Sequence, residues 1–217
     1  MARERVQQAG LFDLVALKLN AMLDEHAPEA TMILDAGTGT GHYLHEILDA
    51  HPQLRGIGLD LSSAGLKRAA KHERGMALAW DLWKPLPLDE NSVDVVLDIF
   101  APRNPAEYAR VLRSSGAVVV VTPRNGHLAE LAEAGLLTQQ EDKHESLLAQ
   151  MRPTFGDPLA HGWVTSTLPV EDEEAADLVM MGPAGHHRDR ADVLVAVEGQ
   201  EIWSVTVDVD ITVWAAR

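Results

Sequence analysis

The chain has 217 residues, 46% of them apolar and 24% charged, and it contains no cysteine; it can bury one substantial core, and disulfides and thiolate zinc sites within the chain are excluded. Thirty-three acidic residues against 18 lysines and arginines give a net charge of −15, which disfavours an approach to nucleic acid unless basic groups are segregated locally. No apolar run reaches the length of a membrane span, and the first residues lack the apolar core of a signal peptide, so we expect a cytoplasmic protein with no membrane partner.

Residues 1–28 are predicted to form an N-terminal helical segment. Apolar residues recur at near-helical spacing over 3–25, with an interruption at Gly10, and Pro28 ends the pattern. This spacing predicts two helical pieces. We therefore expect residues 29–217 to form the main domain.

The stretch 31–43, TMILDAGTGTGHY, predicts a buried strand, a glycine turn and the start of a helix over 42–50. Glycines at every second position allow positive φ angles and a close approach of the backbone to a ligand. The spacing departs from the G-x-G-x-x-G dinucleotide fingerprint, and no Gly-Lys-Ser/Thr of a P-loop follows. An unused turn with a capping aspartate is the alternative to a ligand-binding loop. The candidate contacts are Asp35, Gly37, Thr38, Gly39 and Gly41.

The next two predicted strands are each followed by an acidic residue. The strand 55–60 ends at Asp60, Ser62 is expected to cap the helix that begins there, and the strand 76–80 precedes Asp81. A carboxylate at the end of the second strand can accept two hydrogen bonds from a ribose diol. Asp60 is therefore a candidate for binding a nucleoside.

Residues 92–100, SVDVVLDIF, form an almost continuous apolar run, as expected for a central parallel strand that is buried on both faces. Asp98 interrupts the run close to the edge of the sheet where ligands bind in open α/β folds, so it must be paired or functional. Phe100 follows, at a rigid exit where an aromatic ring can meet a planar substrate. A helix over 103–113 and a strand over 116–122 are predicted next.

The remaining chain is predicted to be less regular. Helical patterns cover 123–134, 139–151, 171–181 and 189–197, and a strand covers 163–168. Residues 201–214 alternate strictly between apolar and polar, which predicts a long strand with one wet or differently packed face. The expected fold is an α/β, doubly wound, mostly parallel sheet with an antiparallel C-terminal strand.

Four stretches resemble one family closely. LDAGTGTGHYL, GLDLSSAGLKRAAK, DVVLDIFAPRNPAEYARVLRSSGAVVVVTP and MMGPAGHH are similar in sequence and order to the RlmA-like 23S ribosomal RNA guanine-N1 methyltransferases. These are class I enzymes with a Rossmann-like fold that use S-adenosyl-L-methionine (SAM). The resemblance implies that the glycine turn wraps the methionine half of SAM, that Asp60 binds the ribose and that Asp81 lies beside the adenine. The implied cofactor-binding set is Asp35, Gly37, Thr38, Gly39, Gly41, Asp60, Leu61, Asp81 and Leu82.

The resemblance has a departure at the N-terminus. Family members usually begin with a small four-cysteine zinc module that helps to hold the RNA, and this chain has no cysteine. We therefore expect either a fragment or a member that has lost its RNA-binding head.

The catalytic candidates are Asp98 and Phe100. Guanine N1 carries a proton that must leave, and a carboxylate within reach would accept it; structural pairing of Asp98 at the strand end is the alternative. Phe100 is expected to stack on an unstacked base. A cluster of arginines can contact phosphates, although solvation is the more common role: Arg103, Arg110, Arg113 and Arg124.

No metal site is expected. The chain has no cysteine, and Asp189 is the only acidic residue at ligand spacing from His186 and His187. This pattern favours a role for the two histidines in a loop or at the rim of a substrate site.

Three functions stay open. The first is an rRNA methyltransferase, whole or as its catalytic fragment, with ribosomal RNA as partner. The second is a small-molecule SAM methyltransferase, which the acidic charge favours. The third is a SAM-binding protein without turnover. The sequence leaves the oligomeric state open, a homodimer included.

Overall fold

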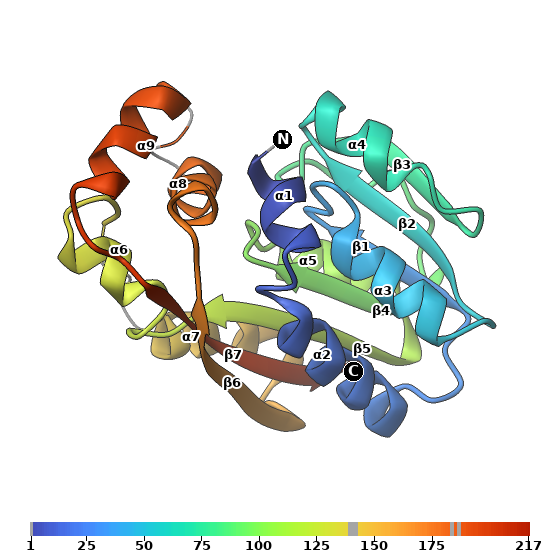
Figure 1. Ribbon diagram of the computed structural model, residues 1–217. Helices are drawn as coiled ribbons and strands as arrows, with labels where there is room; N and C mark the ends of the chain where they lie inside the picture. The colour runs from blue at the N-terminus through green and yellow to red at the C-terminus, as the bar shows by residue number, and fades with distance from the viewer. Residues whose placement is uncertain (1, 139–142, 183–184, 186–187) are drawn as a thin grey trace. The chain divides into compact units, whose positions relative to one another are not determined.

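The computed structural model describes residues 2–138, 143–182, 185 and 188–217. It contains a seven-stranded sheet with the strand order β3-β2-β1-β4-β5-β7-β6 (Figure 1). Internal contacts divide the chain into two compact units, each described here by itself. The sheet unit is 16–122, 143–162 and 210–217, and the terminal unit is 1–15, 123–142 and 163–209. Among the described helices, none combines the length and hydropathy needed to cross a bilayer.

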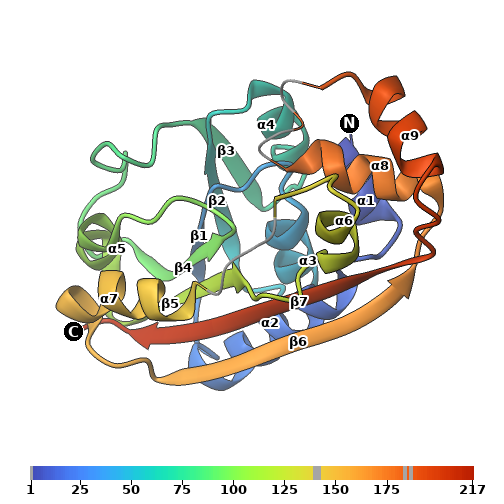
Figure 2. The same ribbon diagram turned by 90° about the vertical axis from the view of Figure 1, so that its left-hand side faces the viewer.

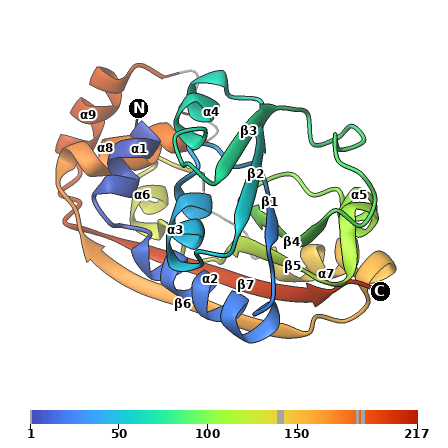
Figure 3. The ribbon, with the colours of Figure 1, turned by 90° about the vertical axis from the view of Figure 1, so that its right-hand side faces the viewer.

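Parallel strands form the centre of the sheet unit (Figure 3). They are β1 (Met32–Ala36), β2 (Arg55–Asp60), β3 (Gly75–Ala79), β4 (Val93–Ile99) and β5 (Leu112–Pro123). The burial of β4 is nearly complete along its length, as the continuous apolar run predicted. This strand is therefore covered on both faces.

Helices cover this parallel sheet. On one face α5 (Pro105–Val111) and α7 (His144–Phe155) contribute Tyr108, Met151 and Phe155 to a buried cluster with the strands. On β2, Gly56 packs against two leucines of α3 (His42–Ala50). The helix α4 (Ser63–Ala69) is capped by the Ser62 hydroxyl, which accepts a 3.2 Å hydrogen bond from the Gly65 amide.

The terminal unit holds most of the other helices. These are α1 (Ala2–Gln8), α6 (Ala129–Glu133), α8 (Asp172–Met181) and α9 (Arg190–Glu198), and α2 (Asp13–His26) begins there and continues into the sheet unit. Asp177 on α8 is 2% exposed and accepts hydrogen bonds from Arg5 at 2.6 Å and Arg190 at 2.8 Å. Burial alone would raise the pKa of this carboxyl, but the two guanidinium groups hold it below its usual value. The ion pairs thus tie α1 and α9 to α8.

The two C-terminal strands are long and lie side by side (Figure 2): β6 (Ala160–Pro169) and β7 (Ser204–Ala215). The predicted antiparallel character of the C-terminal strand is confirmed. The polar side of β7 is packed rather than wet, since Asp208, Asp210 and Thr212 are at most 8% exposed. Within the terminal unit, Asp208 accepts hydrogen bonds from Arg124 at 2.9 Å and Thr165 at 2.7 Å.

The predicted elements agree closely with the structure up to residue 111. The predicted bounds of α3 and β2 are confirmed, as are the two helical pieces around Gly10, whose φ is +75°. Several predictions were wrong in extent. The strand β5 begins at Leu112 rather than 116, α6 covers only Ala129–Glu133 of the helix expected over 123–134, α7 continues to Phe155 rather than 151, and β6 covers Ala160–Pro169 rather than 163–168. The early start of β5 coincides with a register shift against β4, where Leu112 pairs with Val93 but Ala117 pairs with Val95. Residues 139–142, expected to begin a helix, lie outside the described residues.

Replacement of Gly65 by alanine is expected to lower the free energy of unfolding by about 1–3 kcal/mol. The added Cβ would lie 2.3 Å from the carbonyl oxygen of Gly39, a backbone atom of the glycine turn that cannot rotate away. Urea denaturation measures the change. Gly75→Ala is the control, because its Cβ would meet nothing closer than 3.4 Å. Equal losses in the two variants would contradict the close packing of α4 on the turn.

Candidate active site

Three carboxylates lie at the carboxyl edge of the parallel strands. Asp35 is on β1, Asp60 ends β2 and Asp98 is near the end of β4. The register aligns them, because Asp35 pairs with Leu97 and Asp60 with Ala79 of β3. The sequence-based placement of these side chains at one edge is therefore confirmed, and this is the edge where open α/β sheets bind ligands.

The glycine turn has the backbone conformation that its sequence predicted. Gly37, Gly39 and Gly41 have φ angles of +91°, +55° and +83°. The amides of Gly37 and Thr38 both donate to the Leu59 carbonyl of β2, at 2.8 and 3.0 Å. A Cβ at Gly37 would also lie 2.5 Å from that of Ala101. The turn is thus held close to its neighbours in a conformation that other residues adopt only with strain.

Asp60 holds the turn through both of its oxygens. Oδ2 accepts a hydrogen bond from the Gly39 amide at 2.8 Å, and Oδ1 accepts one from the Ser62 amide at 2.7 Å. An ionised carboxylate has about four lone-pair positions, so each oxygen can accept one more hydrogen bond. The same group can therefore position the glycine turn and bind a diol. The next residue, Leu61, has a side chain that is 74% exposed.

Asp35 is 2% exposed at the start of the turn. Burial raises the pKa of its carboxyl to about 7; the Thr38 hydroxyl opposes the shift and the Asp60 charge adds to it. Thr38 itself is 8% exposed. This carboxyl is therefore buried at the start of the glycine turn, with a pKa close to neutral pH.

Asp98 is fully buried and paired. The Tyr108 hydroxyl donates a 2.8 Å hydrogen bond to its Oδ2. Burial raises the pKa of Asp98 to about 7, while Tyr108, the Arg103 charge and the Ala101 amide oppose the shift. The other oxygen, Oδ1, accepts no hydrogen bond of good geometry from any described group. The Ala101 amide does not provide one either. This arrangement leaves a buried acceptor at the sheet edge.

Phe100 lies just beyond this carboxylate with its side chain 43% exposed. Its φ of +55° is in the left-handed region, which a bulky residue rarely adopts. Its stacking on a planar substrate stays a prediction.

Asp81 and Leu82 follow β3 at the same edge. The Asp81 Oδ1 accepts a 3.0 Å hydrogen bond from the Trp83 amide, so part of this carboxylate is used in a local turn. Leu82 is 7% exposed and its carbonyl accepts a hydrogen bond from the Asn104 side chain at 2.9 Å. Their adenine contacts stay predictions.

Sequence reasoning missed Tyr108 as the partner of Asp98. Its position on the buried side of α5, one turn before Val111, was visible in the pattern, but the pairing depends on how α5 packs.

The candidate phosphate-binding arginines are engaged with the protein: Arg110 with Glu107 at 2.7 Å, Arg113 with Asp94 at 2.7 Å, Arg103 with Gln150 at 2.9 Å and Arg124 with Asp208 at 2.9 Å. His186 and His187 lie outside the described residues.

Known proteins are similar to this chain in sequence. A family described as a methyltransferase domain matches residues 33–119. A protein of Streptomyces fradiae named 23S rRNA (guanine(748)-N(1))-methyltransferase is 36% identical over 184 residues, 83% of this chain and 65% of the relative. A Micromonospora griseorubida protein named a putative 23S rRNA (guanine-N(1)-)-methyltransferase is 38% identical over 161 residues, 74% of this chain and 55% of the relative. The chain thus spans less than two thirds of the length of either relative.

A solved structure has the same fold. A SAM-dependent methyltransferase from Geobacter sulfurreducens, in complex with S-adenosyl-L-homocysteine, superimposes with a TM-score of 0.56. It is 18% identical and covers 93% of this chain and 90% of its own. The class I Rossmann-like methyltransferase fold that the sequence predicted is confirmed.

Asp98→Asn is expected to change the pH dependence of stability. The folded-state pKa of about 7 lies above the usual 3.8, so the folded state holds the proton more tightly, and wild-type stability falls as the pH rises from about 4 through about 7. The asparagine lacks this loss. Its free energy of unfolding relative to wild type should rise by about 2–3 kcal/mol from about pH 5 to about pH 8. Urea denaturation at several pH values measures it, with the 83% exposed Asp157 changed to asparagine as control; a constant difference for Asp98→Asn would contradict the buried proton.

The residues at this edge fit SAM. The turn brings glycine backbone to the rim, and Asp60 has lone pairs for two ribose hydroxyls. This match of donors and acceptors agrees with the similarity of sequence and fold. The chain therefore has the class I SAM-dependent methyltransferase fold, carries a methyltransferase domain over residues 33–119, and is similar in sequence to the two proteins named above as 23S rRNA guanine-N1 methyltransferases.

Proposed function

We propose that the chain is the catalytic part of a methyltransferase that transfers a methyl group from SAM to N1 of a guanine in 23S rRNA. The observation that carries this proposal is the similarity to the Streptomyces fradiae protein, which extends over 83% of the chain. The match includes the region of Asp98 and Phe100 as well as the glycine turn, so it goes beyond the cofactor-binding residues common to many methyltransferases.

Positioning is the main task of the chain in this reaction. Bound SAM supplies an electrophilic methyl group on a sulfonium. The glycine turn and Asp60 bind and orient the cofactor, since hydrogen bonds to Leu59 and Asp60 hold the turn to β2. A rigid site that holds the two reactants in line can provide most of the acceleration.

Asp98 and Phe100 serve the acceptor in this proposal. The Phe100 ring, 43% exposed, stacks on an unstacked guanine. Asp98, with its pKa raised to about 7 by burial, accepts the N1 proton, because a base works best when its pKa lies near the working pH. The competing role for Asp98 is the structural pair with Tyr108.

A small-molecule methyltransferase is the second candidate. The net charge of −15 and the engagement of the arginines with protein groups favour it, since RNA binding depends on cations that are available to phosphates.

Methyl transfer from labelled SAM to 23S rRNA transcripts tests the proposal. We expect incorporation at one guanine, seen as a stop in reverse transcription because N1 methylation blocks base pairing. Asp98→Asn should retain its affinity for SAM but transfer the methyl group at least about 100-fold more slowly. An unaffected rate would leave Asp98 with only the structural role. Incorporation into small molecules but not into RNA would favour the second candidate.

Asp60→Ala is expected to weaken SAM binding at least about tenfold, because a hydrogen bond to a charged group contributes roughly 1.5–3 kcal/mol. Isothermal titration calorimetry measures the affinity. Asp60→Asn keeps the size of the side chain but has a single carbonyl oxygen, which cannot replace both acceptors. Asp157→Ala changes an exposed carboxylate and is the control. Unchanged affinity in both Asp60 variants would remove the ribose assignment.

A further inference from the structure

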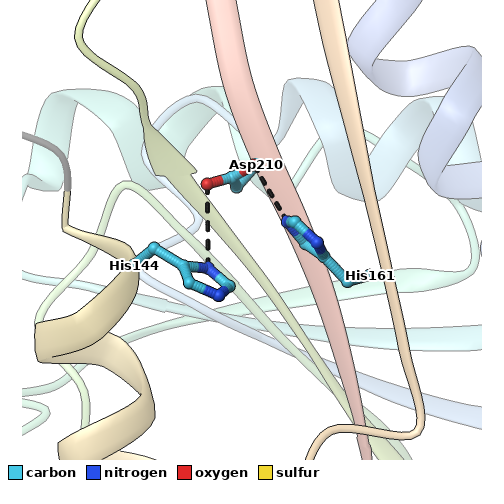
Figure 4. Close-up of side chains that lie close together, drawn as sticks. All are labelled: His144, His161 and Asp210. Carbon is cyan, nitrogen blue, oxygen red and sulfur yellow. Dashed lines mark hydrogen bonds and ion pairs between the residues drawn. The ribbon is translucent and has the colours of Figure 1, made fainter.

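A second group of ligand-type side chains lies in the sheet unit, and the methyl-transfer site does not use it. His144 is the first residue of α7, His161 is on β6 and Asp210 is on β7. Figure 4 shows both imidazole rings beside the Asp210 carboxylate. One ligand atom from each residue lies within 4.8 Å of the other two, and no other such group of three occurs in the part of the chain that the structure describes.

The spacing of these atoms is close to that of a tetrahedral zinc site. The His161 Nε2 is 3.0 Å from the Asp210 Oδ1, and the His144 Nδ1 is 3.8 Å from the Oδ2. Zinc ligands at about 2.0–2.1 Å from the ion are separated from one another by about 3.4 Å. The two separations from the Asp210 oxygens lie on either side of this value.

The donor set selects the class of metal. Two imidazoles and one carboxylate suit borderline ions such as Zn²⁺, Co²⁺ and Ni²⁺, whereas Mg²⁺ and Ca²⁺ prefer oxygen alone. The Asp210 side chain is 6% exposed and those of His144 and His161 are 27% and 39% exposed. A buried carboxylate thus forms the base of the group, with access to solvent on the histidine side. Coordination requires a lone pair on each nitrogen, so His161 would bind as the Nδ1-protonated tautomer.

We propose that His144, His161 and Asp210 bind one Zn²⁺ or a similar divalent transition-metal ion, with water in the remaining coordination position. The site joins the start of α7 to the neighbouring strands β6 and β7. Because α7 places Leu147, Met151 and Phe155 in the buried cluster, the ion fixes a helix on which the core depends. The site is independent of the methyl acceptor.

Zinc and cobalt titrations of the metal-free protein test the site. We expect one Zn²⁺ per chain by calorimetry, a rise in the thermal midpoint with Zn²⁺ but not with Mg²⁺, and the intense visible absorption of tetrahedral Co²⁺. His161→Gln changes the most exposed ligand and should fold normally. Loss of an outer partner of a ligand already weakens metal binding by about 10- to 100-fold, so this variant should lose at least about 100-fold.

Two controls make the result specific. His72→Gln removes a histidine that pairs with Asp49 at 3.1 Å outside any such group of three among the described residues, and it should leave the affinity unchanged. The double variant His186→Gln/His187→Gln should also retain the site. Asp210→Asn should behave like His161→Gln. Absence of Zn²⁺ binding in the wild type, or equal binding in wild type and His161→Gln, would overturn the proposal.

Discussion

The hydrogen bonds of the Asp60 carboxylate fix the geometry on which the candidate active site depends. One oxygen accepts a hydrogen bond from the Gly39 amide of the glycine turn, and the other accepts one from the Ser62 amide at the start of α4. An amide left without an acceptor would cost about 1–3 kcal/mol, so the glycine turn, β2 and α4 are placed together. Gly65 completes the arrangement, because only the absence of a side chain lets α4 approach the Gly39 carbonyl.

Two further carboxylates at the same edge are stabilised less completely. Burial raises the pKa of both Asp35 and Asp98 to about 7, so each is readily neutralised close to neutral pH. Desolvated acids of this kind weaken a fold when they ionise, and they are concentrated at functional sites more than elsewhere. The hydroxyl of Tyr108, an uncharged group, donates a hydrogen bond to the Asp98 carboxyl. The edge therefore combines the hydrogen-bonded carboxylate of Asp60 with two buried carboxyls whose pKa is raised to about 7.

Local patterns predicted the parts of the fold that local physics determines. The bounds of α3 and β2, the glycine turn and the Ser62 cap follow from periodicity, positive φ angles and capping chemistry. The early start of β5 depends on a register shift against β4, which single-chain periodicity does not contain. Tyr108 is only ten residues from Asp98, but their pairing depends on how α5 packs on the sheet. His144, His161 and Asp210 are far apart in sequence, and only the packing of α7, β6 and β7 brings them together.

The backbone conformation of Phe100 lowers the stability of the fold next to the candidate active site. A phenylalanine with a φ of +55° is less favourable than glycine there by roughly 1–3 kcal/mol. Its backbone amide donates a 3.2 Å hydrogen bond to the Val121 carbonyl, which helps to hold it in place. A glycine at this position would relax the chain and remove the ring together. Backbone stability and an exposed aromatic side chain thus place opposite demands on this one position.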